Sequence, residues 1–581
     1  MYILGLNAFH GDSSCCLFKD NQLVCAAEEE RFTRIKHYAG LPFESIKFCL
    51  NDQKIDISDI DYITINRDPK SKVLQKIIYA IKNKFQIIKL FNRVKNLKKI
   101  KNLKLEIEKE FNCKDIKAKV CNIEHHTAHI ASSVFTSNFT NCNYLSVDGF
   151  GDFVSTVAGK FQNGKIFKFD EVLFPHSLGL FYTLITQFLG FKKYGDEYKV
   201  MGLSAYGNPK YINEVESLFL KKDKKLFELD LKYFLHHSGN VEMTWYNQEP
   251  KISDIFSEKV FSLLGNPREI DEKITQKHMD IASSAQKVYE NILFKILNDL
   301  YLKNKTENLC LSGGCALNSL ANGKISNFTP FNKIYINHSP GDSGGSIGSV
   351  LAFLNKGNKK NIYINDNPYL GPKFSNDYIQ TLVDNSFEKL ENSKVKVKKY
   401  EIQDDMLKAT AKELSEGKIV GFFQGNMEFG ARALGNRSIL ADPRIKDIRD
   451  VLNKKIKNRE EFRPFAPSVL SEKKVEWFGD EDISPFMSKV IKINSSKANL
   501  VPGVVHADQT CRAQIVNKDK NLVFYNLIKY FDKITNVPMV INTSFNENEP
   551  IVCKPEEALS CFLRTDMDIL VLENYIFKRY R

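Results

Sequence analysis

The chain has 581 residues, more than one hydrophobic core normally accommodates, so at least two domains are expected. No stretch approaches the roughly 20 uninterrupted apolar residues of a membrane span, which excludes an integral membrane protein of the helical type. The opening residues Met1 to Leu6 lack the basic start of a signal peptide, and the 12 scattered cysteines form no Cys-x-x-Cys pair. We therefore expect a cytoplasmic protein with reduced cysteines.

The chain begins with a predicted strand and hairpin, at residues 2–6, 13–18 and 22–28. The loop Asn7 to Ser14 between the first two strands is rich in small and hydroxyl residues. Loops of this kind present backbone amides to phosphate in actin-like and sugar-kinase-like ATPases, and a plain polar hairpin is the alternative. Glu28 to His37, which follows, is too dense in charge for a core, so we expect a solvated edge or the charged wall of a cleft.

Most of the net charge of +13 lies between Pro69 and Ala118, where 15 Lys or Arg stand against 4 Asp or Glu. Apolar residues recur there at helical spacing and predict an amphipathic helix with a lysine-rich outer face: Leu74, Ile77, Ile78, Ile81, Phe85 and Ile88. This segment is either a solvated helical insertion packed on the body or a site that attracts an anionic partner. That partner would be a phosphorylated acceptor, a nucleic acid or a membrane surface, and the sequence does not choose among them.

Three of the 11 histidines lie within Glu124 to His129. If the chain is helical from His125, then His125 and His129 project from one face and can reach a single cation; ordinary capped or half-buried histidines are the alternative. Two acids follow predicted strands at glycine-rich turns, Asp148 after residues 144–147 and Asp342 after Lys333 to Ile336. They are natural oxygen donors for the same ion.

The first half of the chain also contains a candidate nucleotide-binding turn and a predicted polar loop. The strand at 309–311 follows a long predicted helix, about Met279 to Leu302, and runs into the glycine turn Ser312 to Asn318, which suits the close approach of a nucleotide. Tyr194 to Gly202 is expected to be a polar loop. Together with the histidine pair, the three strand-to-glycine junctions predict a cleft that binds a nucleotide and a metal.

The polar, turn-rich residues 357–374 predict a linker to a second domain. That domain is expected to begin with a helix near residues 405–416 and a strand at 418–423. Arg432, Arg437 and Arg444 lie among glycines, and guanidinium groups match phosphate oxygens in pairs. Lys454, Lys455, Lys457, Arg459 and Arg463 add to the same positive field. A phosphate pocket is therefore predicted, with a solvated basic face as the alternative.

With these motifs the chain resembles the O-carbamoyltransferases of the nodulation-factor, cephalosporin and tobramycin type. The resemblance extends over nearly the whole length, and its motifs match in order: His10 to Ser14, Glu28 to Arg34, Glu124 to His129, Val147 to Gly149, Gly195 to Gly202, Ser312 to Asn318, Gly421 to Arg444, Arg463 to Pro467 and Asn542 to Asn546. The sequence departs from the family pattern at Asn426, where arginine is common, at Ala431, where proline is common, and at Ser204-Ala205, which replaces Ala-Pro.

The resemblance implies an α/β fold in two domains. Residues 1–356 would form a duplicated actin-like (ribonuclease H-like) domain related to the tRNA threonylcarbamoyl transferases, with the basic helical insertion at about 69–118. Residues 357–374 would be the linker. Residues 375–581 would form an α/β domain related to the threonylcarbamoyl-adenylate synthases.

The resemblance also implies a two-step reaction. Carbamoyl phosphate and ATP, with Mg, would yield carbamoyl-adenylate in the second domain, and the first domain would pass the carbamoyl group to a hydroxyl of a sugar or natural product. By resemblance the metal ligands are His125, His129, Asp148 and Asp342, for iron(II), manganese or zinc. The other implied site residues are His10 as base or orienter of the acceptor, Lys457 as a second catalytic residue, Asp12, Gly313, Gly314 and Asn318 for ATP or adenylate, and Arg432, Arg463, Arg512 and Ser544 for carbamoyl phosphate and ATP.

Two alternatives belong to other functional classes. An actin-like ATP phosphotransferase would not need the arginines of the second domain and would release ADP rather than AMP. A nucleotide-dependent binding protein would use the basic insertion to contact a polyanion. If the chain is a carbamoyltransferase, no nucleic-acid partner is expected, and a homodimer is compatible with the resemblance. The acceptor cannot be identified from the sequence, because variable loops form the walls of acceptor-binding sites.

Overall fold

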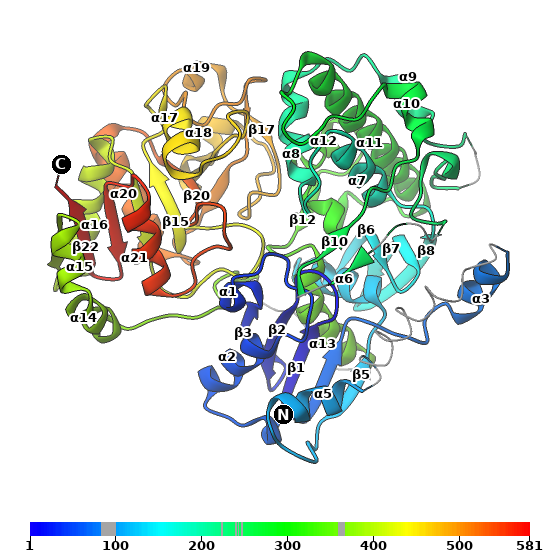
Figure 1. Cartoon of the computed structure of the whole chain (residues 1–581), viewed down its shortest axis with the longest axis horizontal. Helices are drawn as coiled ribbons and strands as arrows, with labels where there is room; N and C mark the ends of the chain where they lie inside the picture. Colours follow the sequence, from blue (N-terminus) through cyan, green and yellow to red (C-terminus); the bar gives the residue numbers. More distant parts are fainter. Residues whose placement is uncertain are drawn as a thin grey trace. The chain divides into compact units, whose positions relative to one another are not determined.

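The computed structural model describes residues 1–82, 100, 102–221, 225–238, 241, 243–245, 248–357 and 366–580. The chain forms two compact units, Met1–Asp366 and Asn367–Arg581 (Figure 1). We call them unit 1 and unit 2. Of the predicted linker 357–374, residues 358–365 lie outside the described part, and the chain from Asn367 onward belongs to unit 2.

Unit 1 contains two five-stranded sheets of the same design, with the orders β3-β2-β1-β4-β5 and β12-β11-β6-β7-β8. In each sheet three consecutive strands form an antiparallel meander, and two later strands add in parallel at the first strand of the meander. The predicted strands at 2–6, 13–18 and 22–28 are thus confirmed as the meander of the first sheet. The strands are β1 (Tyr2–Asn7), β2 (Ser14–Lys19), β3 (Gln22–Glu28), β4 (Tyr62–Ile65), β5 (Lys119–Asn122), β6 (Asn141–Gly151), β7 (Val154–Gln162), β8 (Lys165–Leu173), β11 (Asn308–Ser312) and β12 (Lys333–Ile336).

Two helices, α6 (His125–Val134) and α13 (Gly345–Lys356), form a layer between these sheets. Helix α13 packs on β1, β2 and β4, α6 packs on β6, β7 and β11, and the two helices pack on each other. Their contact requires glycine, because a Cβ at Gly348 would lie 1.9 Å from the Ala128 carbonyl oxygen. The same layer therefore fixes α6, which carries the histidines, between the second sheet and α13.

The remaining helices of unit 1 cover the outer faces (Figure 1). They are α1 (Glu30–Thr33), α2 (Phe43–Gln53), α3 (Val73–Lys82), α5 (Leu103–Glu110), α7 (Leu178–Phe188), α8 (Glu197–Leu203), α9 (Ile212–Glu216), α10 (Phe261–Leu264), α11 (Gln276–Lys303) and α12 (Ser319–Phe328). The short strands β9 (Met243–Thr244) and β10 (Lys251–Ile252) pair with each other. Among the described helices, none is both long and apolar enough to cross a bilayer.

Three expectations for unit 1 were wrong. Tyr194 to Gly202 is not a loop throughout, because α8 begins at Glu197 and buries Val200 and Leu203. Glu28 to His37 is not simply solvated, because Glu28, Glu29 and Arg31 are buried. In the basic insertion, α3 ends at Lys82, and its apolar residues rather than its lysines form the outer face. Phe85 and Ile88 of the predicted helix lie outside the described residues.

The buried charged side chains between Glu28 and His37 have partners nearby. Arg31 forms ion pairs with Glu28 and Glu30. Glu29 accepts hydrogen bonds from the backbone amides of Glu44 (3.0 Å) and Ser45 (2.8 Å) at the start of α2. A carboxylate satisfied by helix N-terminal amides can be buried at modest cost, which charge density along the sequence does not reveal.

Unit 2 is built on one mixed sheet of eight strands in the order β13-β22-β21-β14-β15-β20-β16-β19. The strands are β13 (Val395–Lys399), β14 (Val420–Phe423), β15 (Arg437–Ala441), β16 (Ala466–Leu470), β19 (Gln514–Val516), β20 (Met539–Ser544), β21 (Ile569–Leu572) and β22 (Tyr575–Arg579), with the separate pair β17 (Ile491–Lys492) and β18 (Thr510–Cys511). The helices are α14 (Asn376–Asn385), α15 (Phe387–Asn392), α16 (Gln403–Ser415), α17 (Ile448–Val451), α18 (Lys474–Phe478), α19 (Ser495–Ala498), α20 (Leu522–Thr535) and α21 (Pro555–Arg564). The predicted helix near 405–416 is α16, and the predicted strand at 418–423 is β14.

Candidate functional site

The first site is built on the N-terminus of α6. The Glu124 carboxylate caps this helix by accepting hydrogen bonds from the backbone amides of His126 (3.0 Å) and Thr127 (2.7 Å) and from the Thr127 hydroxyl (2.7 Å). Because the helix begins at His125, the imidazoles of His125 and His129 lie on one face, with their Nε2 atoms 3.0 Å apart. His126 points elsewhere and bonds to the Ser146 hydroxyl (2.8 Å) and the Val154 carbonyl (3.1 Å).

Two carboxylates from the second sheet complete the cluster. Asp148 of β6 places Oδ2 3.0 Å from Nε2 of His125 and 3.3 Å from Nε2 of His129. Asp342, which follows β12, places Oδ1 3.5 and 3.4 Å from the same two atoms. One donor atom from each of the four residues lies within 4.8 Å of all the others. The predicted set is therefore brought together by geometry suited to one cation.

The electrostatics of this cluster also favour positive charge between its members. Burial alone would lower the pKa of His129, yet the hydrogen bonds to Asp148 and Asp342 raise it to about 10. Likewise the pKa of Asp148 is held well below its usual range by His125 and His129, against the opposing effect of burial. Two buried carboxylates facing two imidazoles fit a divalent ion, because its charge would replace the protons that otherwise hold the four groups together.

His10 lies at the edge of this cluster, with Nδ1 3.1 Å from Asp342 Oδ2 and its ring 5.7 Å from that of His125. Burial lowers the pKa of His10, Arg67 adds to the effect, and Asp342 opposes it. Its Nε2 is buried and has no hydrogen-bond partner among the described residues. A neutral imidazole with one nitrogen held by a carboxylate and the other available is arranged as a base.

The loop that carries His10 differs from the predicted phosphate loop. The backbone amides of Phe9, Asp12 and Ser13 are already bonded to carbonyls of residues 37–40. The Asp12 carboxylate lies 2.7 Å from Nδ1 of His37. These three amides therefore fix the loop on the neighbouring segment rather than point to a ligand, and the loop's role in the described structure is to position His10.

The glycine turn after β11 lies beside Asp148. The Gly314 amide donates to Asp148 Oδ1 (3.1 Å), and a Cβ at Gly313, where φ is +84°, would lie 2.2 Å from the Val147 carbonyl oxygen. Asn318 caps α12 through the Ala321 amide (3.1 Å) and exchanges two hydrogen bonds with Gln286. The turn thus holds one oxygen of Asp148 and leaves the other toward the histidines.

Sequence reasoning missed Arg67 and Asp152 at this site. Arg67 follows β4, and its Nε is buried with no hydrogen-bond partner among the described residues. Burial lowers its pKa, while Asp152, Asp342 and Tyr194 act in the opposite direction, so its side chain lies within their electrostatic reach. Asp152 accepts from the His125 amide (3.0 Å). The signal that could have found Arg67 is the one that found Asp148, a polar residue directly after a buried strand.

The second site is a group of cations in unit 2. The Lys457 ammonium, buried, donates to Asn546 Oδ1 (2.7 Å), to the Asn546 carbonyl (2.8 Å) and to the Ser544 carbonyl, and lies 3.3 Å from the Ser544 hydroxyl. Burial holds its pKa well below the usual range, and Arg459 and Arg463 add to this. Burial likewise lowers the pKa of Arg512, with Arg432, Arg459 and Arg463 as the further causes.

Apart from burial, the groups that lower the pKa of Arg512 are all guanidinium groups, and one of them, Arg463, also lies 3.7 Å from the Glu460 carboxylate. Several guanidinium groups this close together favour an anion among them. The residues that sequence and resemblance named for unit 2, Arg432, Lys457, Arg463, Arg512 and Ser544, fall into this neighbourhood.

Two arginines predicted for the phosphate pocket do not face it. Arg437 is fully buried and donates to the carbonyls of Gln424 (2.8 Å), Gly425 (3.1 Å), Asn436 (3.0 Å) and Pro372 (2.9 Å). Arg444 is paired with Asp442. These side chains hold loops together, because backbone carbonyls and a buried carboxylate already use their donors.

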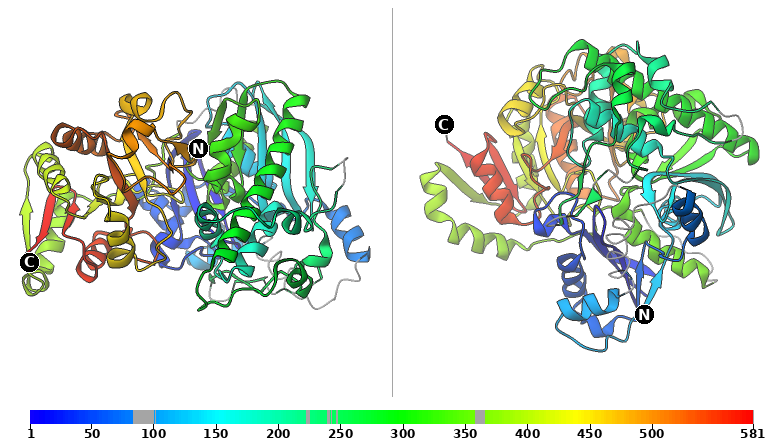
Figure 2. Two further views of the ribbon diagram at one scale, coloured as in Figure 1. Left: turned by 90° about the horizontal axis from the view of Figure 1, so that it is seen from above. Right: turned by 45° about the vertical axis from the view of Figure 1, so that its right-hand side comes forward.

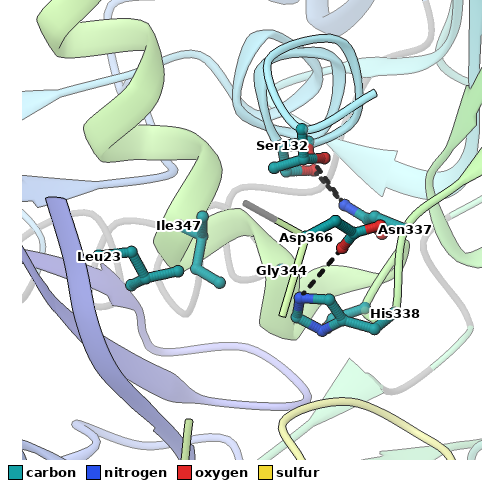
Figure 3. Close-up of a pocket in the computed structure, with 9 residues that line it drawn as sticks. Leu23, Ser132, Asn337, His338, Gly344, Ile347 and Asp366 are labelled. Carbon is teal, nitrogen blue, oxygen red and sulfur yellow. Dashed lines mark hydrogen bonds and ion pairs between the residues drawn. The ribbon is translucent and has the colours of Figure 1, made fainter. Parts of the chain in front are cut away.

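A small pocket lies farther along α6, beside Ser132 (Figure 3). Asn337 donates from Nδ2 to the Ser132 carbonyl (3.0 Å) within it, and His338 Nε2 lies 3.8 Å from Asp366 Oδ1. Its lining contains none of the four cluster residues and neither His10 nor Arg67. The pocket is therefore distinct from the metal cluster.

Comparison with known proteins identifies the family of the chain. The family model described as "Carbamoyltransferase N-terminus" matches residues 2–351, and that described as "Carbamoyltransferase C-terminus" matches residues 411–579. The uncharacterized protein sll1178 of Synechocystis is 37% identical over all of this chain and 97% of its own length. Nodulation protein NolNO of Sinorhizobium fredii is 32% identical over 99% of this chain and 80% of its own. The crystal structure of T. kodakarensis HypF covers 63% of this chain and 48% of its own, with 13% identity and a TM-score of 0.31, which is too low to identify a shared fold.

Proposed function

The chain belongs to the carbamoyltransferase family, and from its two charged clusters we propose that it is an ATP-dependent O-carbamoyltransferase with one half-reaction in each unit. Unit 2 would form carbamoyl-adenylate from carbamoyl phosphate, water and ATP with Mg, releasing phosphate and pyrophosphate, and unit 1 would transfer the carbamoyl group to a hydroxyl of a sugar or natural product, releasing AMP. The observation that carries the proposal is the pairing of a cluster suited to a cation in unit 1 with a group of neighbouring cations suited to an anion in unit 2.

In the first half-reaction, Lys457 and the arginines would offset the repulsion between two phosphorylated substrates. Arg432, Arg463 and Arg512 supply the guanidinium groups. No carboxylate is among the groups that shift the pKa of Arg512. The Ser544 hydroxyl, 3.3 Å from the Lys457 ammonium, would donate to or accept from the same ligand. These side chains would lower the barrier to adenylation by holding the negatively charged phosphates of the two substrates close together in a site that excludes water.

In the second half-reaction, the imidazole Nε2 of His10 would accept the proton of the acceptor hydroxyl while Asp342 holds Nδ1. Arg67 would hold the oxygen that gains negative charge as the carbamoyl group is attacked. His125, His129, Asp148 and Asp342 would bind a divalent ion, of which iron(II), manganese and zinc suit two imidazoles and two carboxylates. When bound, this ion supplies Lewis acidity toward a carbonyl or phosphate oxygen.

The nucleotide product tests this proposal. Purified protein given ATP and carbamoyl phosphate, with a panel of sugar nucleotides and hydroxylated metabolites, should release AMP. Release of ADP alone would refute the proposal and favour the actin-like phosphotransferase. Absence of nucleotide turnover with every acceptor, in protein loaded with the divalent metal, would favour a nucleotide-dependent binding protein.

The two half-reactions can be separated with single variants. The variant His10→Asn should still form carbamoyl-adenylate, detected by exchange of labelled pyrophosphate into ATP, but should not pass the carbamoyl group on. Lys457→Met should lose the exchange. If His10→Asn transfers at the normal rate, His10 has no part in the second step.

A further inference from the structure

Helix α3 (Val73–Lys82) has its apolar side turned away from the protein. The exposed fractions of Leu74, Ile77, Ile78 and Ile81 are 66%, 50%, 44% and 74%. These positions follow the spacing i, i+3, i+4, i+7, so they form one continuous stripe along the helix. Figure 1 and the left view of Figure 2 show α3 at the periphery of unit 1.

The opposite side of α3 faces the body of unit 1 and is polar. Lys72 is paired with Glu171, and Lys76 is half-buried, with Asp152 and Asp68 opposing the lowering of its pKa by burial. The Tyr79 hydroxyl lies 3.4 Å from the His237 carbonyl, and its ring packs against Phe174 with centroids 5.0 Å apart. The helix is therefore held in this orientation by specific contacts, with its amphipathic pattern reversed relative to an ordinary surface helix.

In the sequence from Pro69 to Leu105, which includes α3, every charged residue is Lys or Arg. Lys70 precedes α3 and Lys82 is its last residue, and both are exposed beside the apolar stripe. A helix with an apolar side flanked by lysines binds at the interface of an anionic bilayer, where the stripe enters the acyl boundary and the ammonium groups meet lipid phosphates.

We propose that α3 docks unit 1 on the surface of an anionic lipid membrane. Attraction to nucleic acid uses phosphate contacts from cations and gives no reason to expose a stripe of leucine and isoleucine, whereas an interfacial helix requires it. Helix α3 is thus neither solvated with its lysines outward nor packed by its apolar side on the body, whereas α5 of the same insertion buries Leu103 and Ile107 in the core of unit 1.

Docking has a consequence for the acceptor that rests on the proposed function. Asp152 accepts hydrogen bonds from the backbone amides of Asp68 (2.8 Å), which precedes α3, and of His125 (3.0 Å), so the segment that leads into the docking helix adjoins the histidine cluster. The hydroxyl that receives the carbamoyl group would then belong to a molecule held at the membrane, such as a lipid-linked sugar.

Vesicle sedimentation tests the docking separately from activity. The full-length protein should sediment with vesicles of phosphatidylcholine containing about 30% phosphatidylglycerol and much less with phosphatidylcholine alone. Leu74→Gln/Ile77→Gln/Ile81→Gln keeps good helix formers in place and should lower the partition coefficient at least about tenfold. The control Ile270→Gln/Leu302→Gln/Ile402→Gln removes three apolar residues that are 61%, 72% and 61% exposed elsewhere and should leave it unchanged.

Four results would overturn the proposal. These are no sedimentation of the unaltered protein with anionic vesicles, equal sedimentation of the α3 variant, an equal loss in the control, and a molar mass by light scattering that halves in the α3 variant. The last would show that a second copy of the chain covers the stripe. AMP release in solution is expected to be the same in all these proteins, so a failure of docking and a failure of the carbamoyltransferase proposal give different results.

Discussion

The cap of α6 by Glu124 makes a quantitative prediction about the metal cluster. The Glu124→Ala variant removes the acceptor for two backbone amides and the Thr127 hydroxyl. Loss of an N-cap costs about 0.5–2 kcal/mol, and hydrogen bonds to a charged group contribute about 1.5–3 kcal/mol each. Glu124 is only partly buried, so water takes over some of these bonds, and we expect a total of about 2 kcal/mol.

Because His125 and His129 lie in the first two turns after this cap, most of that cost should appear as poorer alignment of the two imidazoles. A change of about 2 kcal/mol corresponds to roughly a 30-fold change in an equilibrium constant. We therefore expect the dissociation constant for a divalent ion to rise about 10- to 30-fold in Glu124→Ala. It should rise less than about fivefold in Glu124→Gln, which keeps a side-chain oxygen as acceptor.

The affinity is measured by competition of the purified full-length protein with a chromophoric chelator for Zn²⁺ or Mn²⁺. Ser375→Ala is the matched control, because Ser375 caps α14 of unit 2 through the Tyr378 amide and lies in the other unit. It should lose a similar cap energy with no effect on metal affinity. An unchanged dissociation constant in Glu124→Ala, with the protein folded, would refute the role of the cap in aligning the ligands.

Three further predictions concern other buried charges. Arg67→Met should slow carbamoyl transfer by about 100-fold or more, as for loss of an oxyanion donor, while pyrophosphate exchange is unchanged; equal transfer rates would exclude the role. Arg437→Met should destabilise unit 2 by about 3–5 kcal/mol in urea unfolding, because four backbone carbonyls lose their hydrogen-bond donor. The control Lys454→Met removes an exposed ion pair with Glu461 and should cost under about 1 kcal/mol. Burial opposes the charging of His37, yet Asp12 and Glu30 raise its pKa to about 9. Since this lies above the unfolded value of about 6.5, the stabilisation is complete below about pH 6.5 and is lost as the pH rises through 9. Unfolding of Asp12→Asn should lack that decline.

The candidate metal cluster could be predicted from sequence because each of its four side chains has a local signature. His125 and His129 follow from helical spacing, and Asp148 and Asp342 follow from buried strands that end in glycines. Parallel strands of one sheet bring their carboxyl ends to one edge, so local patterns were enough to predict a shared site. Arg67 has the same signature after β4, but a lone arginine after a strand does not suggest a ligand set.

Arginine roles in unit 2 were not readable in the same way. Arg432 and Arg437 lie five residues apart among the same glycines, yet Arg437 is buried among carbonyls. Which cation faces a ligand depends on carbonyls and carboxylates supplied by distant segments, such as Pro372 for Arg437. The same limit applies to α3, where helical spacing predicts a stripe correctly but does not say which side of the helix meets the body.

The two clusters present opposite versions of one physical problem. Asp148 and Asp342 bring two negative charges into a buried site, whereas Arg432, Arg463 and Arg512 bring positive charges together in unit 2. Burial disfavours charge, and a ligand of opposite charge would lower that cost beyond what the neighbouring side chains already do, so each unit should be more stable with its ligand than without it. Ligands that bind only the folded state stabilise it in proportion to the logarithm of their concentration. A divalent ion should therefore protect unit 1 from unfolding while leaving unit 2 unaffected, and carbamoyl phosphate should protect unit 2 but not unit 1. Unfolding measurements would thus assign each ligand to one unit without any acceptor present.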